Sequence, residues 1–232
     1  MHAKRQTDKF ERLAKYSLDE ENQKIYKERA KKWNKSSTVL EHDIIEYNED
    51  SERSITKYSV KELLEQSLKI NNYLNSIGIS ASKWSGKTFV KTIEEMPMSM
   101  GVKKRVCDIW LREDASTKTI IHEHLHARSS SWLEKRLKKD RGFEEGTCEL
   151  FAEEICKRNN IPYKETYREY VDPLRKFNSK INKYESDYDF ALALFKIDMD
   201  KREQWLIDLA EEQGLIKSIV LKQLIKKVRN GK

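Results

Sequence analysis

The residues best suited to chemistry lie in one short stretch, IIHEHLHAR at 120–128, which holds three of the five histidines of the chain. On a helix, the imidazoles of His122 and His126 project from the same face one turn apart, near enough to share one metal ion. Glu123 lies about 100° round the helix from His122, so its carboxylate reaches the edge of that site without being a ligand. The pattern His-Glu-x-x-His therefore predicts a zinc site with a general base beside it. The middle histidine, His124, points away from this face, and we expect it at the surface or in a supporting role.

A hydrolytic zinc site needs a third protein ligand and keeps its fourth position for water, and two histidines with one carboxylate suit zinc. In a chain of this composition, the five-residue pattern alone arises by chance in about one sequence in a hundred. A second segment, GFEEGTCELFAEEICKRNNIP at 142–162, has the pattern of a helix and supplies carboxylates downstream. These acidic residues are Glu144, Glu145, Glu149, Glu153 and Glu154.

The two segments together resemble the gluzincin class of zinc metallopeptidases, in which a second helix carries a Glu as the third ligand. In the aminopeptidase branch of that class, eighteen residues separate the second His from this Glu, and a Gly follows it. Eighteen residues lie between His126 and Glu145, and Gly146 follows. The resemblance implies that Glu145 is the third ligand and that Glu149 holds a ligand histidine by its other ring nitrogen. Glu144 takes the place of Glu145 if the helix is rotated.

The run from Glu145 to Ala152 is also similar to the Glu-x-x-Ala-Asn-x-Phe-Ala run of small cytoplasmic peptidases that phages and mobile elements encode and that act on repressors. It departs from that run at Cys148 and Glu149. The metzincin class fits less well, since it needs Gly and His where this chain has Ser129 and Trp132. Both favoured comparisons select Glu145.

The N-terminal stretch YSLDEENQKIYKERAKKW at 16–33 resembles segments of minor head proteins of phages of Gram-positive bacteria. No catalytic motif accompanies this second resemblance. It implies an alternative function, a structural or assembly protein of a phage or mobile element in which the metal site is structural or inactive.

The gluzincin resemblance implies a mechanism for a zinc ion on the three expected ligands. The pKa of the bound water would fall toward ~7, and Glu123 would take its proton and pass it to the leaving amine. The class places an oxyanion donor beyond the third ligand, for which Tyr163, Tyr167 and Tyr170 are candidates of equal standing. It also implies that a strand upstream of the active helix pairs with the substrate backbone, and Val106 to Leu111 is placed for that.

The surrounding pattern predicts the elements that hold these residues. A capping box at Ser59 starts a helix at 59–77, whose expected apolar face includes Val60, Leu63, Leu64, Leu68 and Leu74. Short β-branched and aromatic runs between 79 and 113 predict a small sheet. Further helices are expected at 117–128, 143–159, 163–182, 186–212 and 215–229, with Asp172-Pro173 kinking or splitting the third. We therefore predict a mainly α-helical α+β fold, a zincin-like metallopeptidase domain at 51–232 preceded at 1–50 by a helical arm and linker.

Composition narrows the class of protein further. The 232 residues include 46 basic and 39 acidic side chains, for a net charge of +7. The longest apolar run, 190–195, is far shorter than the ~20 residues of a membrane helix, and the start MHAKRQTDKF has no apolar leader. We therefore expect a cytoplasmic protein, virion-associated if it belongs to a phage, with a peptide or protein substrate and no membrane partner. Its charge alone does not indicate nucleic-acid binding, and the N-terminal arm is the candidate surface for a protein partner.

Other reactive side chains have simpler expected roles. The three cysteines form no paired framework, and we expect Cys148 and Cys156 to be small core residues. Arg128 follows the histidine cluster and is expected to be a charged helix end.

Overall fold

The computed structural model describes residues 58–79, 82–97, 99–103, 108–129, 134–215 and 217–231, and for Lys103 and residues 134–140 it describes the backbone only. The chain divides into two units, Met1–Ile55 and Thr56–Lys232, so every described residue belongs to the second unit. The helices and linker predicted within 1–54 lie outside the described residues.

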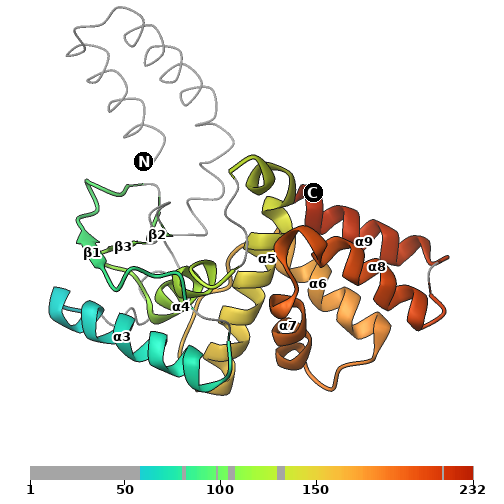
Figure 1. Cartoon of the computed structure of the whole chain (residues 1–232), viewed down its shortest axis with the longest axis horizontal. Helices are drawn as coiled ribbons and strands as arrows, with labels where there is room; N and C mark the ends of the chain where they lie inside the picture. Colours follow the sequence, from blue (N-terminus) through green and yellow to red (C-terminus); the bar gives the residue numbers. More distant parts are fainter. Residues whose placement is uncertain are drawn as a thin grey trace, which may run out of the picture. The chain divides into compact units, whose positions relative to one another are not determined.

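The described part is mainly helical with one small sheet, which confirms the predicted α+β class (Figure 1). Its elements in chain order are α3 (Val60–Ser76), β1 (Thr88–Lys91), β2 (Gly101–Lys103), β3 (Ile109–Arg112), α4 (Thr117–His126), α5 (Glu134–Arg158), α6 (Arg168–Ile181), α7 (Asp187–Lys196), the short 3₁₀ helix η1 (Met199–Lys201), α8 (Arg202–Glu212) and α9 (Ile219–Asn230). The long helix α5 is central, because it packs against α4 on the side of the sheet and against α6, α7 and α9 on the other side (Figure 1). Among these helices, none has both the length and the apolar character needed to cross a membrane.

Helix α3 begins at the predicted capping box. The Ser59 hydroxyl accepts a hydrogen bond from the Glu62 amide (3.3 Å), and the Glu62 carboxylate accepts one from the Ser59 amide (2.7 Å). The prediction of the apolar face of α3 is wrong in part. The buried side is formed by Leu63, Ser67, Ile70 and Leu74, whereas Val60, Leu64 and Leu68 are exposed. A small polar residue occupies the buried side because Ser67 bonds to groups in the core.

The sheet has the order β1-β3-β2, with β3 parallel to β1 and antiparallel to β2. Trp110 in β3 lies opposite both Phe89 in β1 and Val102 in β2. Because β3 is paired along both of its sides, the expectation that residues 109–111 pair with a substrate backbone is wrong. Residues 104–107 lie outside the described part. Both β2 and β3 contact the histidine helix α4, and β2 forms one edge of the sheet as described.

The C-terminal helices differ from the predicted boundaries in three places. Helix α5 begins at Glu134, well before the predicted 143, and α6 begins only at Arg168 but continues through Pro173 to Ile181. Pro173 lies inside α6, where its missing amide leaves the carbonyl of Glu169 without its helical partner, yet the helix continues to Ile181. The predicted helix at 186–212 is interrupted after Lys196, where Ile197 is extended, and resumes through η1 as α8.

Candidate metal centre

Helix α4 is fixed in the core, with its histidine face toward α5. Its first turn is capped by Ser116, whose hydroxyl accepts a hydrogen bond from the Thr119 amide (3.2 Å). Ile120, Ile121 and Leu125 are fully or almost fully buried on its other sides. This packing determines the direction in which the histidines point.

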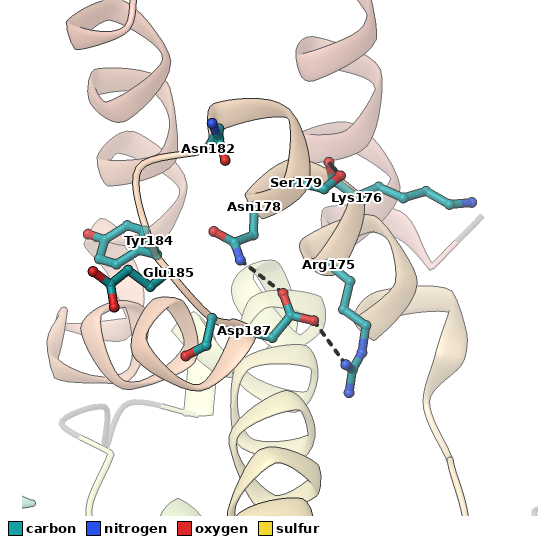
Figure 2. Close-up of a pocket in the computed structure, with 9 residues that line it drawn as sticks. Arg175, Lys176, Asn178, Ser179, Asn182, Tyr184, Glu185 and Asp187 are labelled. Carbon is teal, nitrogen blue, oxygen red and sulfur yellow. Dashed lines mark hydrogen bonds and ion pairs between the residues drawn. The ribbon is translucent and has the colours of Figure 1, made fainter.

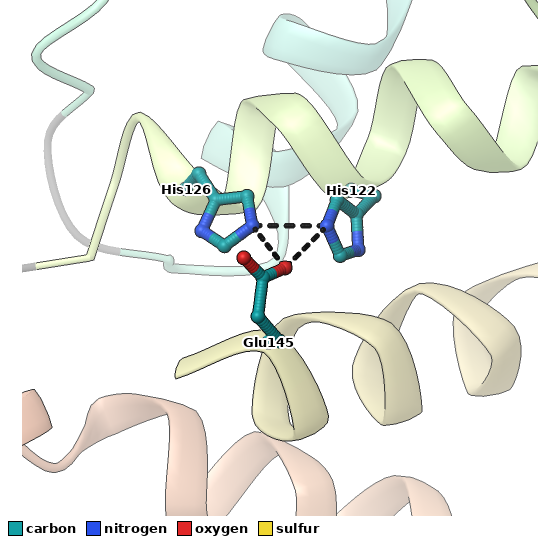
Figure 3. Close-up of side chains that lie close together, drawn as sticks. All are labelled: His122, His126 and Glu145. Carbon is teal, nitrogen blue, oxygen red and sulfur yellow. Dashed lines mark hydrogen bonds and ion pairs between the residues drawn. The ribbon is translucent and has the colours of Figure 1, made fainter. Parts of the chain in front are cut away.

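His122, His126 and Glu145 converge on one point between α4 and α5 (Figure 3). The two Nε2 atoms are 2.9 Å apart, and Oε2 of Glu145 lies 3.4 Å from Nε2 of His122 and 3.3 Å from Nε2 of His126. Ligand atoms at 2.0–2.1 Å from a tetrahedral zinc ion are about 3.3 Å from one another. Both distances to the carboxylate match this value, and the two imidazole nitrogens, at 2.9 Å, would have to move slightly apart around an ion. Two imidazoles with one carboxylate form a suitable donor set.

The outer nitrogen of His126 is held by a buried carboxylate. Its Nδ1 makes a 2.9 Å hydrogen bond to Oε1 of Glu144, so Nδ1 carries a proton and Nε2 is the nitrogen that faces Glu145. The other oxygen of Glu144 accepts hydrogen bonds from the Ser129 hydroxyl (2.7 Å) and from Nη1 of Arg202 (2.6 Å). Glu144 thus supports a histidine from behind, and Glu145 is the residue that faces both imidazoles.

His122 has a similar neighbour on its own side. Its Nδ1 lies 2.9 Å from Oε2 of Glu149, a hydrogen-bonding distance although the groups are poorly aligned. Oε1 of Glu149 accepts short hydrogen bonds from the Lys118 ammonium and the Thr166 hydroxyl. Burial raises the pKa of Glu149, but His122 and Lys118 outweigh it and lower that pKa to about 2. Each histidine of the pair therefore faces a buried, ionised carboxylate that is itself paired with a buried cation.

A second group of candidate donors, His126, Glu144 and Cys148, also lies close together. Burial and the Glu144 carboxylate raise the pKa of the Cys148 thiol to about 11, so the thiol is protonated in the metal-free protein. Glu144 is already engaged by Arg202. Cys148 and Cys156 are both fully buried, in agreement with their expected place in the core.

The charges around the centre favour a divalent cation. Four carboxylates that are buried or mostly buried surround it, those of Glu123, Glu144, Glu145 and Glu149. Three of them pair with cations: Glu149 with Lys118, Glu144 with Arg202 and Glu145 with Arg141 at 3.7 Å. Ionised carboxylates packed this closely favour the binding of a divalent cation. Burial and His126 lower the pKa of His122, but Glu145 and Glu149 outweigh them and raise it, so without a metal the cluster attracts protons instead.

His124 points away from the metal ligands, as predicted, but it is buried, so the expectation that it lies at the surface or supports the site is wrong. Its ring is fully buried on the opposite side of α4, where Nε2 makes a 2.8 Å hydrogen bond with the Ser67 hydroxyl and the ring meets Trp84 edge-on. Burial and Arg128 lower its pKa to about 3, so it is neutral. Arg128 is buried as well, and its guanidinium bonds to Asn71 and Asn75 of α3. Both residues join α3 to α4.

The three tyrosine candidates are separated by their positions. Tyr167 stacks on His122, with ring centroids 5.7 Å apart and planes within 2° of parallel. Tyr170 lies behind Tyr167 against α5, and a Cβ atom on Gly146 would come within 2.8 Å of its Cβ. Tyr163 packs on the edge of the core near Glu153. Tyr167 is therefore the tyrosine of this set that reaches the centre.

The sequence-based reasoning missed three contributors, Lys118, Arg202 and Gly101. Gly101 in β2 comes so close to Glu123 that a Cβ atom there would lie 2.7 Å from Cγ and 2.9 Å from Oε1 of that side chain. The GVK stretch of β2 carried no motif, and Lys118 and Arg202 were two among 46 basic residues. No local signal in the chain distinguishes them.

Comparisons of the chain with protein-family models, with curated proteins and with solved structures find no match. A function is therefore inferred from the donor atoms, the buried charges and the residues around them.

Proposed function

We propose that this chain is a zinc-dependent peptidase of the gluzincin type with a zincin-like domain, in which His122, His126 and Glu145 hold the ion. One observation carries the proposal: two imidazole nitrogens and a carboxylate oxygen meet at 2.9–3.4 Å with zinc-like spacing. Carboxylates behind both histidines support the same conclusion.

Zinc at this position would supply a water of lowered pKa, near ~7, and would polarise a carbonyl group. Glu123 follows His122 on α4 and is almost fully buried under Gly101 of β2. It is the carboxylate available to accept a proton from the attacking water and return it to the leaving amine. Its burial restricts the carboxylate to a narrow range of orientations, which general-base catalysis requires.

Tyr167 is the best candidate for an oxyanion donor. Burial, together with the charges of Glu145 and Glu123, raises the pKa of its hydroxyl to about 12. The hydroxyl therefore remains protonated at neutral pH and can donate a hydrogen bond to a developing negative charge. The influence of both carboxylates also indicates that the tyrosine belongs to the same cluster as the proposed ligand and base.

For the substrate we propose an extended peptide beside β2. This strand contacts α4, and Gly101 brings its backbone against Glu123. On its other side, β2 has no partner strand within the described residues. A peptide added there would be aligned by backbone hydrogen bonds next to the proposed base.

The decisive experiment measures zinc content before any substrate is known. The wild-type protein is expected to hold one zinc per chain, and His122→Ala and Glu145→Ala are expected to lose it. Glu154→Ala is the matched control, since Glu154 is a buried carboxylate on the same helix that pairs with Arg175 instead. The proposal fails if the wild type holds no stoichiometric metal and added zinc changes neither the melting temperature nor hydrolysis of a mixed peptide library. Stoichiometric zinc without hydrolysis would favour the alternative of a structural site.

A further inference from the structure

Arg202, the first residue of α8, has a fully buried side chain. Its Nη1 lies 2.6 Å from Oε2 of Glu144, and its Nη2 donates to the Ser129 hydroxyl at 3.3 Å. Its remaining donors reach the carbonyl oxygens of Phe195 (3.4 Å) and Ile197 (3.2 Å), which the end of α7 leaves without helical partners. A buried guanidinium with every side engaged holds its partners in one geometry.

Through Glu144, this guanidinium is one side chain away from a proposed zinc ligand. Oε2 of Glu144 meets Arg202, while Oε1 meets Nδ1 of His126 at 2.9 Å. Burial raises the pKa of Glu144, but the charge of Arg202 and the hydrogen bond from His126 outweigh burial and lower it. An ionised carboxylate fixes both the proton on Nδ1 and the angle of the imidazole ring.

The two histidines differ in where their support originates. Behind His122, the cation that holds Glu149 is Lys118, which belongs to the same helix α4. Behind His126, the cation belongs to α8, far along the chain from α4 and α5. Only the second arrangement makes the orientation of a ligand depend on how a C-terminal helix is docked.

We infer that Arg202 is a positioning residue of the metal centre, which acts through Glu144 to orient His126 and so links zinc affinity to the docking of α8. This inference rests on the proposed function, because it presumes that His126 binds zinc. Loss of such outer support typically lowers metal affinity 10- to 100-fold.

A double-mutant cycle on zinc affinity tests the inference, with chelator competition as the measurement. Arg202→Met and Glu144→Gln are each expected to weaken zinc binding 10- to 100-fold. If Arg202 acts through Glu144, the combined variant should bind within about two-fold of the weaker single variant. The combined variant removes both buried charges, so it should fold even if Arg202→Met, which leaves the Glu144 carboxylate without its cation, does not fold.

Two further measurements separate positioning from a purely structural role. Arg202→Lys keeps the charge but loses the planar fork, and it should shift the visible absorption bands of the cobalt-substituted protein, which a loss of stability alone would not do. Arg112→Met with Asp114→Asn is the control, since it removes another largely buried pair (2.8 Å) away from the histidines. The control should leave zinc affinity unchanged.

The inference is overturned if folded Arg202 variants bind zinc as tightly as the wild type with an unchanged cobalt spectrum. It is also overturned if the losses from Arg202→Met and Glu144→Gln multiply as independent effects. A wild-type protein that binds no zinc would instead overturn the proposed function itself.

Discussion

Tyr167 stacks flat on the ring of His122 while its own backbone is left-handed, with φ at +52°. For a non-glycine residue this conformation costs roughly 1–2 kcal/mol. The neighbouring Thr166 compensates by donating a hydrogen bond from its hydroxyl to Glu149. Backbone strain of this kind tends to be kept where a side chain must be aimed at a functional site.

Removing the hydroxyl of Tyr167 tests whether the position of this side chain beside His122 serves catalysis. Tyr167→Phe keeps the ring stacked on His122, so zinc content and melting temperature should stay the same. If the hydroxyl stabilises the oxyanion, kcat should fall about 10²- to 10³-fold. Tyr163→Phe, at the edge of the core, is the control and should retain wild-type kcat. Equal activity in the two variants would remove Tyr167 from the mechanism.

Glu123→Gln separates catalysis from metal binding. Glutamine has nearly the same shape but cannot accept a proton at neutral pH, so hydrolysis should fall roughly 10²- to 10⁴-fold. Zinc stoichiometry should remain unchanged because Glu123 is not one of the three converging donors. Metal analysis and a peptide assay on the same preparation provide the check, and an active Glu123→Gln protein would contradict the proposed role.

Gly101→Ala probes the contact between β2 and the proposed base. The added methyl group would meet Cγ of Glu123 at 2.7 Å and Cγ2 of Thr119 at 2.9 Å. One of these neighbours must move, so we expect lower kcat with zinc retained. Val102→Ala, on the same strand, is the control and should alter kcat much less. A Gly101→Ala protein with wild-type kcat would show that Glu123 tolerates the displacement.

His124→Ala should distinguish the middle histidine from the other two. The variant loses a buried ring and its hydrogen bond to Ser67, so the free energy of unfolding should fall by about 2–4 kcal/mol. Zinc content should remain at one per chain in the folded protein, in contrast to His122→Ala. Urea unfolding and metal analysis test both parts, and loss of zinc from folded His124→Ala protein would place His124 at the centre after all.

The raised pKa of Glu153 predicts that the stability of the fold depends on pH. Burial and the charge of Glu149 raise its pKa to about 7, against the opposing effects of Arg175 and Lys118. The folded state therefore binds a proton more tightly than the unfolded state, whose carboxyl has the ordinary pKa near 4.5. The contribution of this group to stability is present below pH 4.5 and is lost as pH rises toward 7. Between pH 5 and pH 8, the free energy of unfolding of Glu153→Gln should rise by about 1–3 kcal/mol relative to that of the wild type. If the two free energies of unfolding change in parallel with pH, the prediction is wrong.

The sequence predicted most helices and the convergence of His122, His126 and Glu145, because periodic apolar residues and a spaced motif are local signals. The sequence-based prediction was wrong where contacts between distant residues determine which side chains are buried and where a helix begins. The apolar residues of α3 did not reveal that Leu64 and Leu68 would face outward while Ser67 is buried. The first turns of α5 are charged and carry no apolar period, so their helical state was missed.

The order of the strands and the partners of buried cations were also out of reach from the sequence. Nothing in residues 109–112 indicates that their strand lies between two others. The order β1-β3-β2 depends on the path of the chain between the strands. The pairing of Arg202 with Glu144 joins residues that are 58 positions apart. Such contacts depend on how η1, which contacts α5, places the start of α8 beside it, and a single sequence does not encode this in any local pattern.

The supporting carboxylates and the third ligand all lie on one helix, and this limits where the chain can change in length. Glu144, Glu145 and Glu149 keep their relative directions through the helical repeat of α5 alone. Near the start of this segment, Gly142 is packed so closely that a Cβ atom there would lie 2.0 Å from the carbonyl oxygen of Val228. A single insertion between Glu145 and Glu149 would turn one of these two carboxylates away from the centre. Related centres in other chains should accordingly be sought by the helical phase of these carboxylates.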